Sequence, residues 1–169
     1  YMHERFFNAP FGSGMYQVYL ATRPEEFAGS AADWDMAEAT LAEVLQERNI
    51  PYKLDVGEAV FYGPKIDVHV RDALGGWQQL TTIQFDFNLP ERFECYYAGA
   101  DGKRHPVYMV HRALLGSLER FVGILVEYYA GAFPLWLAPT QVIILPIADR
   151  HHSYADKVKQ ALADADKQE

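Results

Sequence analysis

The feature that most limits how this chain can fold is the block of residues 52–110, in which apolar and polar side chains alternate. Ile66, Val68 and Val70 are separated by single polar residues, so one face of this segment is expected to be buried and the other polar. Glycine-containing turns such as Gly75–Gly76 separate the segments, and strands joined by short turns pair antiparallel. The block therefore predicts an antiparallel sheet. Its expected strands are residues 52–56, 66–70, 77–87, 93–97 and 106–110, with an earlier strand at residues 15–21.

Helical periodicity flanks this sheet along the chain. Helices are expected at residues 33–48, 112–129 and 152–165. The connector at residues 133–140 carries two prolines and leads into a continuously apolar run at residues 141–147, which is typical of a parallel strand. This change of strand type predicts two domains. Residues 1–138 would form an α+β domain with helices flanking the antiparallel sheet, and residues 139–169 the first βα unit of an α/β domain.

Composition excludes several classes of protein. The net charge of −8 and the pI near 5.2 argue against a chain that coats nucleic acid by charge, although a local basic surface remains possible on an acidic protein. The single cysteine, Cys95, cannot form an intramolecular disulfide and fits a reducing cytoplasmic setting; we expect it in the core. No apolar run reaches the roughly 18 residues that a membrane helix needs, and the first residues do not open a signal peptide.

Three segments are candidates for chemistry, and the first is FYGPK at residues 61–65. The Gly63–Pro64 pair predicts a tight backbone shape just before a strand, which would hold Tyr62 and Lys65 rigidly. The alternative is an ordinary turn that carries a surface lysine.

The second segment is the long strand WQQLTTIQFDF, residues 77–87, which places several polar side chains among large hydrophobic ones. Strand interiors disfavour such groups unless each has a partner or a ligand. The alternative is a solvent-facing polar side. Gln79 and Gln84 are an odd number of residues apart, so they can share a face only if a bulge or bend lies between them.

The third segment is HRALLGSLERFVGILVE at residues 111–127, taken as a helix. Gly116 and Gly123 each cost roughly 1 kcal/mol in a helix interior. We therefore interpret them as lying on one helix face that closely approaches another backbone, with Arg120 projecting past it. The alternative is an amphipathic helix with an Arg120–Glu127 surface pair.

Together these segments resemble threonyl-tRNA synthetases, a family of class II aminoacyl-tRNA synthetases. GEAVFYGPKIDVHVRD, QLTTIQFDFNLPERF and HRALLGSLERFVGILVEYYAGAFPLWLAPTQV are similar to consecutive blocks of that family, and the last contains what looks like motif 3. The resemblance covers residues 18–160. It implies the class II catalytic core for the antiparallel sheet and the start of an anticodon-binding domain for the last segment.

The resemblance also implies a two-step reaction: threonine and ATP give threonyl-adenylate, and the threonyl group then passes to tRNA(Thr). A carboxylate must attack an α-phosphate, so cations and Mg²⁺ on the phosphates would lower the barrier. By similarity, Arg120 and Lys65 are the catalytic cations that contact ATP, and Gln79 and Thr82 hold adenosine.

On the threonine side, the resemblance implies a pocket lined by Tyr62, Gln84 and Ser117. His111 would be one of three protein ligands of a Zn²⁺ ion whose open positions take the amine and hydroxyl of threonine. Such coordination would reject valine, which has the same shape.

The sequence also departs from the family. The family's other two zinc ligands and its motif 2 arginine precede the segment that matches ATRPEE, and the residues before Ala21 do not reproduce them. His3, His69 and His151–His152 are not expected to be ligands. A non-catalytic paralogue or truncated module that binds tRNA, nucleotide or a partner synthetase is therefore the alternative function. A synthetase for proline or serine is a third reading. By similarity, a cytoplasmic homodimer is expected.

Overall fold

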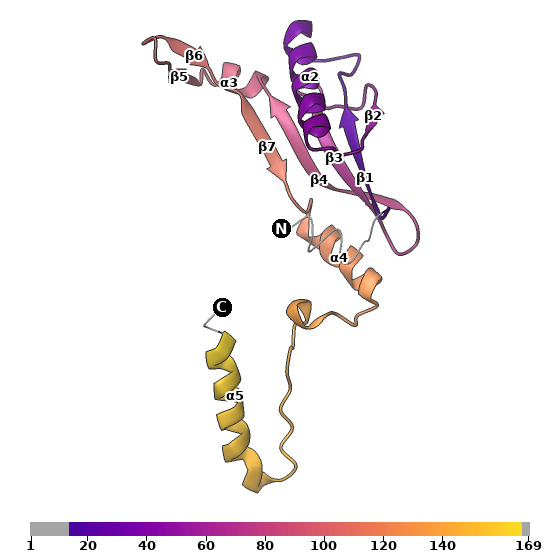
Figure 1. Ribbon diagram of the computed structural model, residues 1–169, viewed down its shortest axis with the longest axis vertical. Helices are drawn as coiled ribbons and strands as arrows, with labels where there is room; N and C mark the ends of the chain where they lie inside the picture. Colours follow the sequence, from indigo (N-terminus) through magenta and orange to yellow (C-terminus); the bar gives the residue numbers. More distant parts are fainter. Residues whose placement is uncertain (1–13, 167–169) are drawn as a thin grey trace. The chain divides into compact units, whose positions relative to one another are not determined.

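The computed structural model describes residues 14–166 and places a five-stranded sheet at the centre of the first part of the chain (Figure 1). The strand order is β2-β1-β3-β4-β7, and every neighbouring pair is antiparallel except β1 and β2, which are parallel. The strands are β1 Tyr16–Ala21, β2 Lys53–Asp55, β3 Lys65–Arg71, β4 Trp77–Asp86 and β7 Met109–Ala113. The expected α+β architecture with a mostly antiparallel sheet is confirmed.

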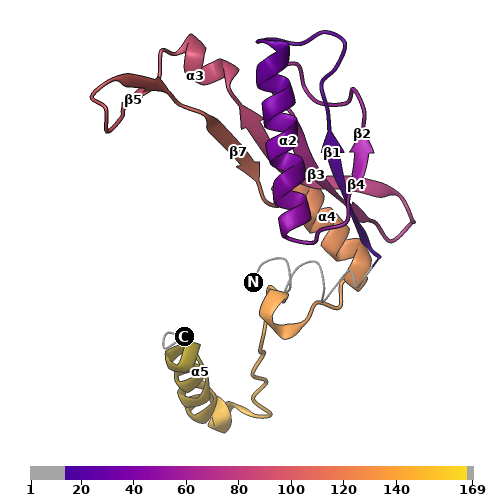
Figure 2. The same cartoon turned by 45° about the horizontal axis from the view of Figure 1, so that its top comes forward.

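Helix α2, Ala31–Glu47, covers one face of this sheet (Figure 2). It begins where Ser30 caps it, with the Ser30 hydroxyl accepting from the backbone N of Asp33 at 3.1 Å. Its apolar stripe packs on alternate residues of the strands, in a cluster made of Val18, Leu20, Leu41, Leu45 and Ile66. Because α2 takes the apolar side, the polar side of the strands is left for other contacts.

A β-bulge interrupts the pairing of β3 with β4. Val68 pairs with Thr81 and His69 pairs with Gln79, so Leu80 is an extra residue in β4. Leu80 is nonetheless buried. Because of this extra residue, side chains before and after the bulge lie on the same face of the sheet when they are an odd number of positions apart in the sequence.

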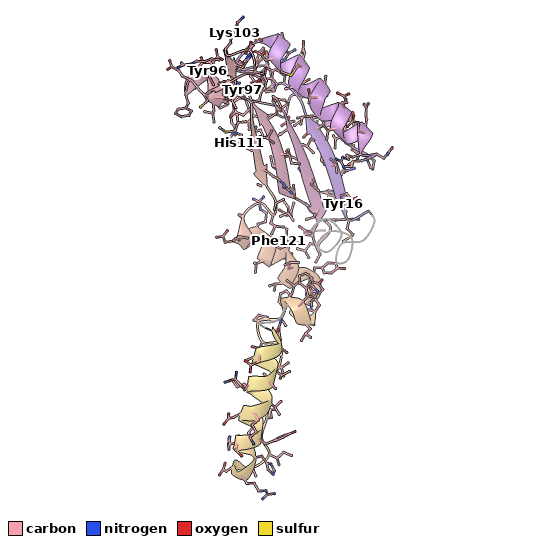
Figure 3. The ribbon with its side chains drawn as sticks, turned by 60° about the vertical axis from the view of Figure 1, so that its left-hand side comes forward. Tyr16, Tyr96, Tyr97, Lys103, His111 and Phe121 are labelled. Carbon is pink, nitrogen blue, oxygen red and sulfur yellow. The ribbon has the colours of Figure 1, made fainter. Side chains whose placement is uncertain are left out.

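After β4 the chain forms two features away from the five-stranded sheet. Helix α3, Asn88–Arg92, was not expected. The strands β5, Tyr96–Ala98, and β6, Arg104–Pro106, form an antiparallel hairpin. The strand expected at residues 93–97 overlaps β5, and the one expected at residues 106–110 is divided between β6 and β7. Figure 3 labels Tyr96, Tyr97 and Lys103 in this hairpin. Cys95 precedes it and is exposed, so the expectation of a core cysteine is wrong.

The expected helix at residues 112–129 is wrong at its start. Arg112 lies in β7, and helix α4 runs only over Leu118–Tyr129. Gly116 lies in the turn between them with φ +65°, a left-handed conformation that no helix residue adopts and that glycine tolerates best. Gly116 and Gly123 therefore do not share a helix face.

Contacts divide the chain into two units, Tyr1–Tyr129 and Ala130–Glu169. The second unit contains two short 3-10 turns, η2 Leu135–Leu137 and η3 Asp149–His151, and helix α5, His152–Asp166, which confirms the last expected helix. The strand expected at residues 141–147 is not formed. Residues 130–166 contain no strand with which it could pair. Within residues 14–166, no helix is both long and apolar enough to cross a membrane.

Candidate functional site

The face of the sheet opposite α2 collects polar side chains from three neighbouring strands. Residues paired directly across a sheet share a face, and Lys65 pairs with Gln84, which pairs with His111. In the next row Asp67 pairs with Thr82. Figure 3 labels His111 on β7, at the edge of the sheet. Strand register alone thus brings together four residues that were singled out in the sequence: Lys65, Thr82, Gln84 and His111.

The bulge adds Gln79 to this face. The Nε2 atom of Gln79 lies 2.9 Å from Oγ1 of Thr82, although the two residues are an odd number of positions apart. This resolves the spacing conflict between Gln79 and Gln84 in the way the sequence required, with the extra residue at Leu80.

Asp67 lies at the centre of this group, and the sequence analysis did not select it. Its carboxylate is 2.6 Å from the Lys65 ammonium through Oδ2, while Oδ1 accepts from Gln79 at 2.7 Å and from Thr82 at 2.6 Å. The side chain of Asp67 is only 5% exposed and that of Lys65 16% exposed, so water screens this ion pair little. An acidic residue between Ile66 and Val68, on the polar face of a strand, was the signal that could have found it.

The FYGPK turn packs closely against the backbone of β4. A Cβ atom built on Gly63 would lie 1.9 Å from the carbonyl oxygen of Phe85, so only glycine fits there. Gln84 donates through Nε2 to the carbonyl of Gly63 at 3.3 Å, and the amide of Asn88 donates to the carbonyl of Tyr62 at 2.8 Å. The turn is thereby tied to β4 and to the start of α3.

The ring of Tyr62 lies near His111. Their centroids are 6.4 Å apart, and the rings meet edge to face. Tyr62, Gln84 and His111 therefore occupy one region, on which the expected threonine pocket depends.

Arg120, in α4, contacts the backbone of β4. Its Nη1 atom donates to the carbonyl of Gln79 at 3.1 Å, and its backbone N donates to the hydroxyl of Ser117 at 3.2 Å. The turn before α4 can approach because Gly116 has no side chain: a Cβ there would lie 2.9 Å from the carbonyl oxygen of Leu80. Close approach to another backbone is therefore confirmed for Gly116, but through a turn. Gly123 meets no atom within 4 Å of such a Cβ among the described residues.

His111 is held by a buried carboxylate. Its Nε2 atom is 2.8 Å from Oδ2 of Asp86, which has no exposed surface, and Oδ1 of Asp86 accepts from the backbone N of Asn88 and of Leu89. A carboxylate that orients a histidine is common behind metal ligands. Residues 14–166, however, contain no group of three or more His, Cys, Asp or Glu side chains that could hold a metal ion. These residues do not make up a zinc site.

His69 lies on β3 near the polar face and is partly buried. Burial lowers the pKa of His69, Lys65 lowers it further, and Asp67 and Asp55 oppose this shift. His69 packs against Tyr19, with ring centroids 4.8 Å apart. His3 lies outside the described residues.

The chain matches the family model of the tRNA synthetase class II core domain (G, H, P, S and T) over residues 3–129. The chain belongs to this class II synthetase family. Among curated proteins, a threonine–tRNA ligase of Aquifex aeolicus is 56% identical over 152 residues, which cover 90% of this chain and 24% of that protein. A threonine–tRNA ligase of Sulfurihydrogenibium is 51% identical over 156 residues, 92% of this chain and 24% of that protein. The chain thus spans about a quarter of the length of these relatives.

Solved structures agree. The RNA-binding domain of a threonyl-tRNA synthetase from Cryptosporidium parvum matches with a TM-score of 0.80 and 39% identity, over 89% of this synthetase chain and 38% of that one. A putative threonyl-tRNA synthetase from Aeropyrum pernix matches with a TM-score of 0.72 and 36% identity, over 97% and 39%. The resemblance to threonyl-tRNA synthetases stated from the sequence is confirmed, and these names do not support a proline or serine enzyme.

Proposed function

We propose that this chain forms the ATP-binding and threonine-binding side of a threonine–tRNA ligase core. The observation that carries the proposal is the meeting of cationic, amide and hydroxyl groups on one face of the sheet, in a chain whose relatives are named for that activity. The reaction would join threonine to ATP as threonyl-adenylate and then transfer the threonyl group to tRNA(Thr).

On the nucleotide side, Arg120 and Lys65 supply the positive charge. Adenylation brings a carboxylate to an α-phosphate, and fixed cations stabilise the charge that develops there. Arg120 is anchored to the backbone of Gln79, so its guanidinium is held beside the strand rather than free to swing. Gln79 and Thr82 would hold the nucleoside, and ATP would enter as its Mg²⁺ complex.

On the threonine side, Tyr62, Gln84 and Ser117 would line the pocket. Support comes from the contact of Gln84 with the FYGPK turn and from the neighbouring rings of Tyr62 and His111. For zinc, the proposal is limited to His111 as one ligand held by Asp86. No step of the reaction is assigned to zinc, because the described residues do not supply its other ligands.

The partners follow from the same reaction. We propose tRNA(Thr), threonine and ATP as ligands, the cytoplasm as the compartment and a homodimer as the assembly, and residues 139–169 as the start of an anticodon-binding domain after a catalytic part at residues 1–138. Sedimentation of the complete natural protein that contains this sequence would test the dimer.

The second candidate is a non-catalytic module that binds nucleotide, tRNA or a partner synthetase. The observation that favours it is the lack of a three-ligand metal group within residues 14–166. It predicts binding of nucleotide, tRNA or a partner synthetase without threonine-dependent chemistry.

Threonine-dependent ATP–pyrophosphate exchange separates the two candidates. We would measure it on the 169-residue chain and on the complete natural protein that contains it, with serine, valine and proline in place of threonine as controls. Exchange that needs threonine and is lost in Arg120→Ala supports the ligase. Binding of ATP, tRNA or a partner synthetase in a calorimeter with no exchange by either protein indicates the binding module. No exchange and no binding of any of these three ligands overturns both candidates.

A further inference from the structure

We propose that Asp67 is the positioning residue of the nucleotide side: its carboxylate sets the places of Lys65, Gln79 and Thr82 before ATP arrives. This inference rests on the proposed function, because it concerns three of the four residues assigned there to ATP. Asp67 itself would not touch the nucleotide.

The contacts divide the carboxylate between its partners. Oδ2 takes the Lys65 ammonium at 2.6 Å, and Oδ1 takes the amide of Gln79 at 2.7 Å and the hydroxyl of Thr82 at 2.6 Å. The fourth ATP residue joins the same network, since Arg120 donates to the carbonyl of Gln79. The Asp67 side chain thus connects Lys65, Gln79 and Thr82, while Arg120 meets Gln79 through the main chain.

A purely structural role would not explain this arrangement. Burying a carboxylate and an ammonium costs desolvation energy, and a well-packed apolar pair of similar volume is often as stable. A bulge at Leu80 is also needed to bring Gln79 to the carboxylate, and bulges occur often beside active sites. The arrangement is instead what preorganisation requires, because a free lysine would have to lose its rotamer freedom when ATP binds.

Asp67 also fixes which atoms Gln79 presents. The Nε2 group of Gln79 donates to both Asp67 and Thr82, so the amide is turned with its nitrogen inward and its Oε1 acceptor away from the carboxylate. Loss of the charge at Asp67 would have two effects at once: the Gln79 amide could rotate, and the Lys65 ammonium would lose its partner.

Asp67→Asn is the direct test, because asparagine keeps the shape and removes the charge. In the complete natural protein we expect the KM for ATP to rise about tenfold, with the KM for threonine changed less than about twofold. If Asp67 acted only as a negative charge, it would repel the phosphates of ATP. Its removal in Asp67→Asn would then lower the KM for ATP. An unchanged or lower KM for ATP overturns the proposal.

Two further variants separate position from charge and from stability. Asp67→Glu keeps the charge but moves the carboxylate by one methylene, so it must also raise the KM for ATP if position matters. Asp72→Asn is the matched control, an exposed carboxylate that closes the β3–β4 turn by accepting from the backbone of Gly76, and it should leave both KM values unchanged.

A double-mutant cycle tests whether Asp67 acts through Lys65. Lys65→Met should itself raise the KM for ATP, and Asp67→Asn should then add less than about twofold to it. Full additivity would show that Asp67 does not act through Lys65 and would overturn the claim that it sets the place of this lysine.

NMR of the 169-residue chain labelled at lysine nitrogen gives a readout that needs no activity. The Lys65 ammonium should exchange its protons with water slowly in the parent chain and much faster in Asp67→Asn. If the parent protein shows no threonine-dependent ATP–pyrophosphate exchange, the proposed function fails. The proton-exchange measurement still decides whether Asp67 holds Lys65. Equal proton-exchange rates in the two chains would overturn the inference even in an active enzyme.

Discussion

Gly63 and Gly116 each bring a turn against the backbone of β4, and each does so because it lacks a side chain. The sequence indicated Gly63 through the Gly–Pro pair that follows the aromatic residues. It misplaced Gly116 in a helix, because Leu114 and Leu118 fit helical spacing and nothing local shows that Gly116 has a positive φ. The close approach at Gly116 depends on Leu80, which is distant in the sequence.

Gly63→Ala should lower the free energy of unfolding by about 3 kcal/mol, because the new Cβ would overlap the carbonyl of Phe85. Gly123→Ala is the matched control. It lies in α4 with no described atom in the way, so it should raise the free energy of unfolding by up to about 1 kcal/mol. Urea unfolding followed by circular dichroism measures both, and equal effects of the two changes would contradict the assignment.

His69 should make stability depend on pH. Its folded pKa is lowered below its unfolded value of 6.5, chiefly by burial, so near and below pH 6.5 the unfolded chain binds more protons at His69 than the folded chain does. The stability that comes from burying neutral His69 is therefore present above about pH 6.5. It is lost as the pH falls from there through the lowered folded pKa.

The His69→Gln variant should consequently lose less stability between pH 7 and about pH 5 than the parent chain. The measurement is urea unfolding at several pH values. His152→Gln, an exposed histidine of α5, serves as the control and should retain the parent's slope. A parent-like slope in His69→Gln would refute this assignment.

At the scale of elements, the sequence predicted those whose pattern is local. Helix α2 and strands β1 and β3 follow from local sequence pattern. The bulge could be stated only as a condition, because its position depends on how β3 and β4 pair. Helix α3 was missed because five residues carry too little periodicity to reveal a helix.

The cap of α2 gives a prediction at this scale. Ser30→Ala should lower the free energy of unfolding by about 1 kcal/mol, because the backbone N of Asp33 loses its acceptor. Ser30→Asp, which can cap in the same way, should restore most of the loss. Thermal and urea unfolding measure both variants, and a neutral Ser30→Ala would show that the cap contributes nothing.

At the scale of the whole molecule, the apolar run at residues 141–147 shows why composition is not enough to predict a strand. The pattern was that of a buried parallel strand, yet Ile143, Leu145 and Ile147 are 70%, 80% and 93% exposed. A parallel strand needs a neighbour for its backbone hydrogen bonds, and residues 130–166 offer none. The pattern indicates what a strand can bury only where a partner exists.

The division of contacts predicts that the first unit folds by itself. A chain ending at Tyr129 keeps the core cluster that joins the sheet to α2, so its melting temperature should shift by less than about 4 °C. Residues 130–169 alone should show little tertiary signal in near-ultraviolet circular dichroism. A large loss of stability in the shortened chain would show that the second unit supports the first.

The contact of Arg120 with Gln79 has a consequence for how such a site can diverge. The acceptor is the main-chain carbonyl of residue 79, which every amino acid carries. A substitution at position 79 therefore changes the side chain on this strand without removing the acceptor that Arg120 contacts. The side chain at this position and the arginine contact can vary independently during divergence.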